Sequence, residues 1–229
     1  MKGSVEMSSP RAAHITGEDQ DRDAQAVRYE WSTIGFQLLN QSAASSAVDR
    51  WAQDGDDGGI YLGAWTSENG RLGRIWVLRR FPDSAAMLAA RERLRLDGHP
   101  LASIDAIESV SVESFAPLPF MPLVETGTFG PAYEIRDYRL VPGGLTDTIA
   151  GWRKALPLRN PVDPITVVMY ALDGPDRLLH IWPFKSPNER LAVRREVYEA
   201  GIWPPPGAPD VIRDADSTMA WPLPSSPLQ

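Results

Sequence analysis

The sequence predicts an α+β protein built from two tandem ferredoxin-like βαββαβ repeats. Three observations support this fold class. Strand and helix patterns follow one another in the same order twice, identical residues recur at an offset of about 103 to 105 positions, and a proline-rich segment separates the two runs. At 229 residues, the chain is long enough for two domains of about 100 residues, each with its own core.

The first unit is predicted at residues 27–116. Its first strand is VRYEWSTIGFQLL, which mixes aromatic and β-branched residues. The run DGDDGG cannot continue a helix, Asn69-Gly70 favours a tight hairpin, and Asp83 or Ser84 can cap a helix that ends before Gly98. We therefore expect a helix, two strands, a second helix and a last strand at residues 43–53, 60–66, 71–80, 84–96 and 109–115.

The second unit is predicted at residues 133–224 with the same order of elements. Its strands are expected at residues 133–140, 164–172, 177–183 and 211–221, and its helices at residues 144–156 and 188–200. Three identities relate the units: Tyr29-Glu30 to Tyr133-Glu134, Gly70 to Gly174, and Leu88-Ala89-Ala90-Arg91 to Leu191-Ala192-Val193-Arg194. Residues 117–132, which begin with PLPFMP, are expected to be a stiff linker.

Composition excludes several classes of function. The chain has no cysteine, so thiolate nucleophiles, iron–sulfur clusters and cysteine-ligated zinc are excluded. Its net charge is -7, with 30 acidic and 23 basic residues and no basic block, which argues against a nucleic-acid partner. No apolar run is long enough to span a membrane. Residues 1–26 lack a targeting pattern and are acidic at 18–23, which predicts a disordered tail on a cytoplasmic protein.

The two sheets should close on each other as a barrel or sandwich, with a ligand cavity between them. In a βαββαβ unit, the helices cover one sheet face and the other face needs a partner. Ile135, Leu179 and Ile181 suit the face under the helices. Alternation along the strands then directs a polar and aromatic set toward the other sheet: Glu134, Arg136, Tyr138, His180 and Trp182.

The second unit also resembles a known family. The stretches YEIRDYRLVPG, VVMYALDG, LLHIWPFKSPNERLAVRRE and WPPP, with Trp152 on the intervening helix, resemble the pattern of the NIPSNAP family, in the dimeric α+β barrel superfamily. The resemblance runs from Tyr133 to Leu223, whereas the first unit has WVLRRF in place of HIWPF. It implies a pseudo-dimeric α+β barrel and little chemistry, although related barrels include cofactor-free monooxygenases, polyketide cyclases, haem-binding enzymes and dehydratases.

Candidate site residues come from the predicted cavity face. His180 could carry a proton near neutral pH, with Glu134 as its orienting carboxylate or as an alternative base and Arg136 stabilising an anion. Aromatic walls for a substrate would come from Tyr138, Tyr170 and Trp182. Each has a structural alternative: a buried histidine satisfied by a carboxylate, an ion pair that braces the sheets, and aromatic rings that fill an interface.

The leading functional prediction is a small-molecule enzyme of specialised metabolism. It would bind an apolar or aromatic substrate and use acid–base chemistry with no cofactor, as a cyclase, dehydratase, isomerase or monooxygenase. No metal site is expected, because His14 falls in the tail and His99 in a loop, so His180 has no second imidazole. The alternatives are a non-enzymatic binding or scaffold protein, and a haem protein in which only His180 could be the ligand. A homo-oligomer is possible.

Overall fold

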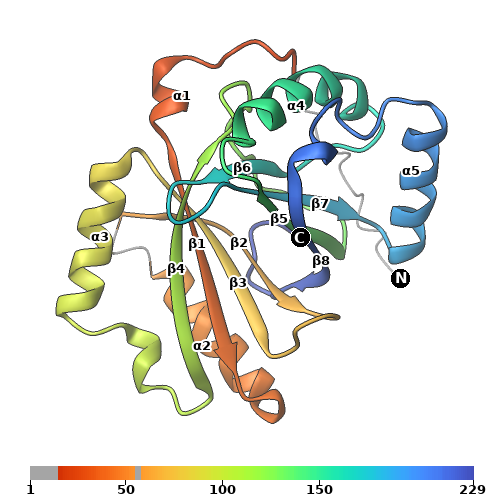
Figure 1. Ribbon diagram of the computed structural model, residues 1–229. Coiled ribbons are helices and arrows are strands. Elements are labelled where there is room, and N and C mark those ends of the chain that lie inside the picture. The colour runs from red at the N-terminus through yellow and green to blue at the C-terminus, as the bar shows by residue number, and fades with distance from the viewer. Residues whose placement is uncertain (1–14, 55–57) are drawn as a thin grey trace.

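Eight strands form a closed barrel, and the helices lie on its outside (Figure 1). The computed structural model describes residues 15–54 and 58–229. The strand order around the barrel is β1-β3-β2-β8-β5-β7-β6-β4, and all neighbouring strands are antiparallel. The predicted α+β class and barrel architecture are therefore confirmed.

The first half of the barrel contains four strands in the order β4-β1-β3-β2. The elements of this half are α1 (Arg22–Ala26), β1 (Arg28–Phe36), η1 (Leu38–Asn40), α2 (Gln41–Gln53), β2 (Ile60–Ser67), β3 (Arg74–Phe81), α3 (Ser84–Leu96), η2 (Pro100–Ser103) and β4 (Ile107–Pro117).

The second half repeats this arrangement in the order β8-β5-β7-β6. Its elements are β5 (Ala132–Leu140), α4 (Leu145–Arg159), β6 (Val167–Ala171), β7 (Arg177–Phe184), α5 (Pro187–Glu199), η3 (Pro209–Val211) and β8 (Ile212–Pro222). The two halves meet at β2·β8 and at β4·β6, and each of these seams pairs only three residues of one strand with three of the other.

The predicted hairpin turns occur where glycine is needed. Gly70 and Gly174 both have a φ of +72°, which is a left-handed conformation that residues with a Cβ rarely adopt. Strand β3 begins at Arg74 instead of the predicted residue 71, because Gly73 also has a positive φ, at +68°, and delays the return of the chain.

The interior of the barrel is apolar and largely aromatic. Its buried members include Tyr29, Trp31, Trp65, Phe115, Tyr133, Ile135, Leu179 and Ile181. Leu228, from the segment after β8, is fully buried in the same cluster, and the backbone of Gln229 is hydrogen-bonded to Gly127 at 2.9 Å. The predicted sidedness of the second half is therefore wrong: Ile135, Leu179 and Ile181 face the interior and do not pack under the helices.

Part of the predicted N-terminal tail is ordered. Ile15 is buried in the cluster beneath α4, and the backbone N–H of Gln20 donates to the carbonyl of Pro119 at 2.9 Å. Asp21 caps α1 by accepting from the N–H of Ala24 at 2.9 Å. These contacts contradict the prediction for residues 15–26, while residues 1–14, including His14, lie outside the described residues.

In the described part of the chain, the longest and most apolar helices still fall short of what a bilayer crossing requires.

Candidate functional site

Glu134 is a buried carboxylate that is neutralised on the helix-covered side of the second half. It is 1% exposed and accepts from Arg190 of α5 at 2.5 Å and from the hydroxyl of Ser217 at 2.6 Å. Arg136 lies 3.7 Å away. Burial acts to raise the pKa of Glu134, but the hydrogen bond from Arg190, the charge of Arg136 and the hydroxyl of Ser217 together hold that pKa below its ordinary value. Glu134 is therefore ionised, and its carboxylate is already bound by Arg190, Ser217 and Arg136.

His180 is paired in register with Arg136 of β5, and aromatic rings surround its imidazole. Its Nδ1 accepts from Nε1 of Trp182 at 2.6 Å, which places the proton of the neutral ring on Nε2. The rings of Tyr138 and Trp152 contact it edge-on, each with centroids 4.9 Å away. Burial, reinforced by the charges of Arg136, Arg159 and Arg194, lowers the pKa of His180 well below its ordinary value of 6.5.

A stacked arginine completes this cluster beneath α4. The guanidinium of Arg159 lies 3.7 Å from the ring centroid of Trp182 and 4.2 Å from that of Trp203. It also pairs with Asp163 at 2.5 Å, and both side chains are less than 5% exposed. Burial raises the pKa of Asp163 to about 6 against the opposing effect of Arg159. The space between sheet and helix is therefore filled with side chains.

The predicted site residues come together, but on the side of the sheet opposite to the one predicted. Tyr138, Tyr170 and Trp182 pack in the cluster under α4 and α5, with Trp152. A barrel interior that excludes water favours apolar side chains, whereas α4 and α5 supply arginines that can neutralise Glu134. Polar residues therefore lie under the helices, and the predicted cavity face is wrong.

Nothing can approach His180 without a rearrangement. It is 0% exposed, so no space the size of a water molecule touches it. A haem would need an open position at the imidazole, where the rings of Tyr138 and Trp152 lie instead. The residues around His180 therefore do not fit a haem. In residues 15–54 and 58–229, no group of three or more His, Cys, Asp or Glu side chains is arranged to hold a metal ion.

The first half has a second buried glutamate at the equivalent place. Glu30 is 1% exposed and accepts from Nε of Arg79 at 3.1 Å and from Nε of Arg91 at 2.7 Å. Arg91, from α3, also donates through Nη1 to Ser114 at 2.8 Å. Each half therefore holds a glutamate on its first strand, an arginine from its last α-helix and a serine on its last strand.

The two halves differ at the residue that faces this glutamate. In the register of the sheet, Glu30 is paired with Arg79, whereas Glu134 is paired with Trp182. Trp182 fills its half together with Trp152 and Trp203, whose rings lie 6.4 and 5.9 Å from it. Arg79 instead extends over Trp51, 4.8 Å from the ring centroid, so the first half lacks this aromatic filling.

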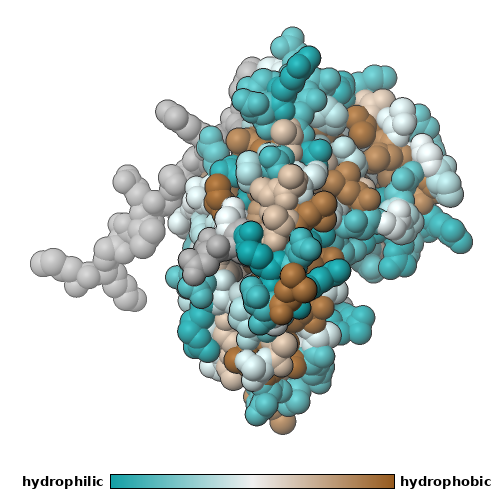
Figure 2. Space-filling model, turned by 90° about the vertical axis from the view of Figure 1, so that its left-hand side faces the viewer, coloured by the Kyte–Doolittle hydropathy of each residue, from teal (hydrophilic) through white to brown (hydrophobic). Residues whose placement is uncertain are grey.

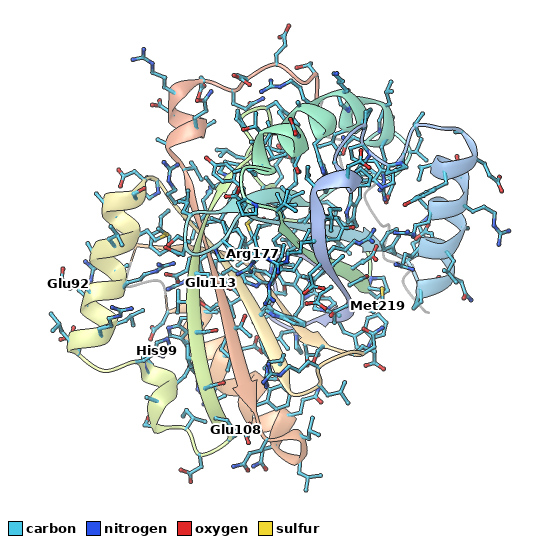
Figure 3. All side chains as sticks on the ribbon, in the orientation of Figure 1. Glu92, His99, Glu108, Glu113, Arg177 and Met219 are labelled. Atoms are coloured by element: carbon cyan, nitrogen blue, oxygen red, sulfur yellow. The ribbon has the colours of Figure 1, made fainter. Side chains whose placement is uncertain are left out.

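A groove of about 680 Å³ lies between α3, η2 and the outer face of the first half, and we call it the α3 groove. Only Met87 and Ala90 of α3 are buried, so the helix from Arg91 onward buries no side chain fully against the sheet. Figure 3 shows His99 at the end of α3 and Glu108 near the start of β4. The lining residues are Glu30, Trp51, Arg79, Arg91, Leu94, Arg95, His99, Ala102 and residues 107–112 of β4.

The α3 groove combines apolar walls with charged groups. Trp51 lies against His99, with ring centroids 5.0 Å apart, and Nδ1 of His99 accepts from the N–H of Leu101 at 3.2 Å. Figure 2 faces the side of the molecule that carries α3 and shows a mainly hydrophilic surface with separate apolar areas. Such a mixture is typical of ligand sites, and the volume lies in their usual range of roughly 300–1,000 Å³.

Sequence reasoning missed this site. Glu30, Trp51, Arg79, Arg91 and His99 were not among the candidate residues. One signal was present, because Tyr29-Glu30 repeats Tyr133-Glu134 and so marked Glu30 as a counterpart of Glu134. The departure of WVLRRF from HIWPF was a second signal, since it places Arg79 where the second half has Trp182.

Comparison with known proteins confirms the resemblance of the second half. The model of the family described as NIPSNAP matches residues 133–227. A curated relative, Protein NipSnap homolog of Dictyostelium discoideum, is 22% identical over 170 residues, which cover 73% of this chain and 70% of the relative.

Two solved structures share the fold over most of their length. An anthrone oxidase-like protein superposes with a TM-score of 0.63 at 9% identity and covers 91% of this chain and 93% of its own. A mutant chlorite dismutase from Candidatus Nitrospira defluvii has a TM-score of 0.57 at 8% identity, over 90% of this chain and 96% of its own. At these identities the likeness establishes the fold alone.

Proposed function

We propose that the protein, whose residues 133–227 match the model of the NIPSNAP family, binds a small organic molecule in the α3 groove of its first half and transforms it by metal-free acid–base chemistry. The observation that carries the proposal is the contrast between the halves. The space between sheet and helices is filled by tryptophans in the NIPSNAP half, and the corresponding space is an accessible groove in the first half. We also propose that the halves are copies of one unit, because both place a buried glutamate at the same register position.

We propose different roles for the two halves on the basis of their side-chain contacts. His180, Glu134 and Arg136 are packed or ion-paired, so we assign them to the stability of the second half. In the α3 groove, the carboxylate of Glu30 is ion-paired with Arg79 and Arg91 and acts as their hydrogen-bond acceptor. Glu108 is exposed and has no ion pair with any described residue, so it is the lining carboxylate best able to accept a proton.

Deuterium wash-in tests this proposal directly. The full chain is incubated in D₂O with a library of aromatic and aliphatic carbonyl compounds, and mass spectrometry follows deuterium uptake at carbons next to the carbonyl. Uptake is expected for the wild type and not for Glu108→Gln. The matched control is Glu92→Gln, which removes an exposed carboxylate of α3 that does not line the groove and points away from it in Figure 3.

Two results would overturn parts of the proposal. Equal uptake by wild type and Glu108→Gln would remove the role given to Glu108. No uptake with any compound, together with no ligand-induced shift of the Trp51 indole resonance, would argue against the α3 groove as a site and favour a non-enzymatic scaffold. Strand β8 supports that second candidate, because residues 214–216 are exposed and pair with β5 on one side only.

A further inference from the structure

We infer that the α3 groove selects an organic carboxylate, with Arg91 and Arg95 binding the anionic group and Trp51 and β4 contacting the apolar body. This inference rests on the proposed function and adds the chemical class of the ligand. It follows from the hydrogen bonds of Arg91, the position of Arg95 and the nature of the opposite wall.

Arg91 is held in place with one end unsatisfied. Its Nε donates to Glu30 at 2.7 Å and its Nη1 to Ser114 at 2.8 Å, which fixes the plane of the guanidinium. Its Nη2 is buried and has no hydrogen-bond partner among the described residues. Buried guanidinium nitrogens are usually paired, so an unpaired one on the wall of a groove is a donor available for an incoming acceptor.

Arg95 lies one helical turn further along the same wall. The spacing of four residues on α3 places its side chain on the same side as Arg91, and both line the groove. Arg95 is exposed and forms no ion pair with a described carboxylate. A bound carboxylate could therefore accept from Arg91 within the groove and from Arg95 at its mouth, as charge-assisted hydrogen bonds.

The opposite wall favours an apolar body over a small inorganic ion. Trp51 is 7% exposed, and Val110 and Val112 of β4 contribute further apolar surface. Ser109 and Ser111 alternate with these valines along β4. A molecule with an aromatic or branched aliphatic body and one carboxylate matches both walls, whereas phosphate alone would leave the apolar wall uncovered.

A matched pair of probes tests the inference. The ligands are 2-naphthoate and its neutral amide, 2-naphthamide, titrated into the full chain at fixed ionic strength and followed by calorimetry and by the indole resonance of Trp51. We expect 2-naphthoate to bind at least about tenfold more tightly than 2-naphthamide. Arg95→Ala should reduce this difference, because only Arg91 then binds the carboxylate, and should leave binding of 2-naphthamide unchanged. Because Arg95 is exposed, its removal should not impair folding.

The control is Arg93→Ala, which removes the same charge from α3 at a position that does not line the groove and should keep the preference for 2-naphthoate. Equal affinity for the two probes in the wild type would overturn the inference and leave the proposed function standing. Binding of neither probe would count against both. Inorganic phosphate that binds as tightly as 2-naphthoate would overturn the assignment of an apolar body.

Discussion

Arg79 and Trp182 occupy equivalent positions on β3 and β7, each paired in register with a buried glutamate of the neighbouring strand. Arg79 lines the accessible α3 groove of the first half, whereas Trp182 lies in the packed core of the second half. Trp182 joins two other tryptophans above its sheet, while Arg79 ion-pairs with Glu30 and lies over Trp51. One residue type at one register position thus distinguishes the half that we propose binds a ligand from the half that we propose provides stability.

Removing the buried carboxylate of the second half should destabilise the fold strongly. Glu134→Ala leaves Arg190 and Arg136 without their shared acceptor, and losing one partner of a buried ion pair costs about 3–5 kcal/mol. The free energy of unfolding by denaturant measures this loss. Arg139→Ala is the control, because Arg139 and Asp214 are 63% and 60% exposed and such pairs contribute about 0–1 kcal/mol. Similar losses in both variants would contradict the role of burial.

Acid should weaken the protein through His180. Since burial depresses its pKa in the fold, the unfolded chain takes up a proton first as the pH falls through the ordinary value of 6.5. The stability that neutral His180 contributes is present above pH 6.5 and is lost progressively below it. Asp163, with a raised pKa of about 6, acts in the opposite direction between about pH 6 and 4.

The variant His180→Gln isolates this effect. We expect the difference in unfolding free energy between wild type and variant to shrink as the pH falls from 7 to 5, because the wild type alone loses the histidine contribution. Asp163→Asn, measured over the same range, separates the opposing carboxyl. A difference that stays constant with pH would show that His180 titrates alike in the folded and unfolded chains.

Gly151 on α4 should tolerate no larger residue, although alanine is the better helix former. A Cβ at this position would lie 2.3 Å from the carbonyl oxygen of Pro206, a backbone atom that cannot rotate away. The gain in helix propensity is about 1 kcal/mol, and we expect overpacking of roughly 1–3 kcal/mol to exceed it. Gly151→Ala should therefore lower Tm and alter the fluorescence of Trp203, and an increase in Tm would refute the contact.

Arg177 should stabilise the seam between the halves at neutral pH. It pairs with Glu113 of β4 and with Asp137 of β5, the latter at 2.8 Å, and Figure 3 shows Glu113 and Arg177 side by side. Arg177→Met removes the shared cation, so we expect a loss of about 1–3 kcal/mol at pH 7. Since burial raises the pKa of Asp137 even beside Arg177, protonation should reduce the loss at pH 4.

Rescue at this seam distinguishes charge from packing. Adding Glu113→Gln to Arg177→Met removes one of the two facing carboxylates and should recover part of the stability at pH 7. If the double variant is as unstable as the single one, the arginine acts mainly through its contact with Phe115, 5.5 Å from the ring centroid.

The order of strands and helices could be predicted because it depends on local patterns. The caps and turns at Asp83, Gly70 and Gly174 mark the ends of elements in the sequence itself. The side of each strand that faces the interior could not be read in the same way. Alternation along β5 places Ile135 and Glu134 on opposite faces of the sheet. It does not say which face lies inside the barrel, because that depends on how the strands close.

A better prediction of sidedness was available from the helix. A strand residue beneath α5 must neutralise the charge of Arg190 on that helix, and a carboxylate such as Glu134 can do so. The α3 groove was harder to foresee. It results from an aromatic residue that is absent at position 79 and from a helix whose only buried residues are Met87 and Ala90. An open space leaves no pattern of its own in the sequence.

Closure of the barrel within a single chain has a consequence for how such a protein can vary. In a dimer of identical subunits, every substitution appears on both sides of the symmetry axis, so a change that opens one half also loosens the other. Here β2·β8 and β4·β6 join strands of different sequence. A substitution in the first half can therefore arise without the same change in the tryptophan cluster of the second half.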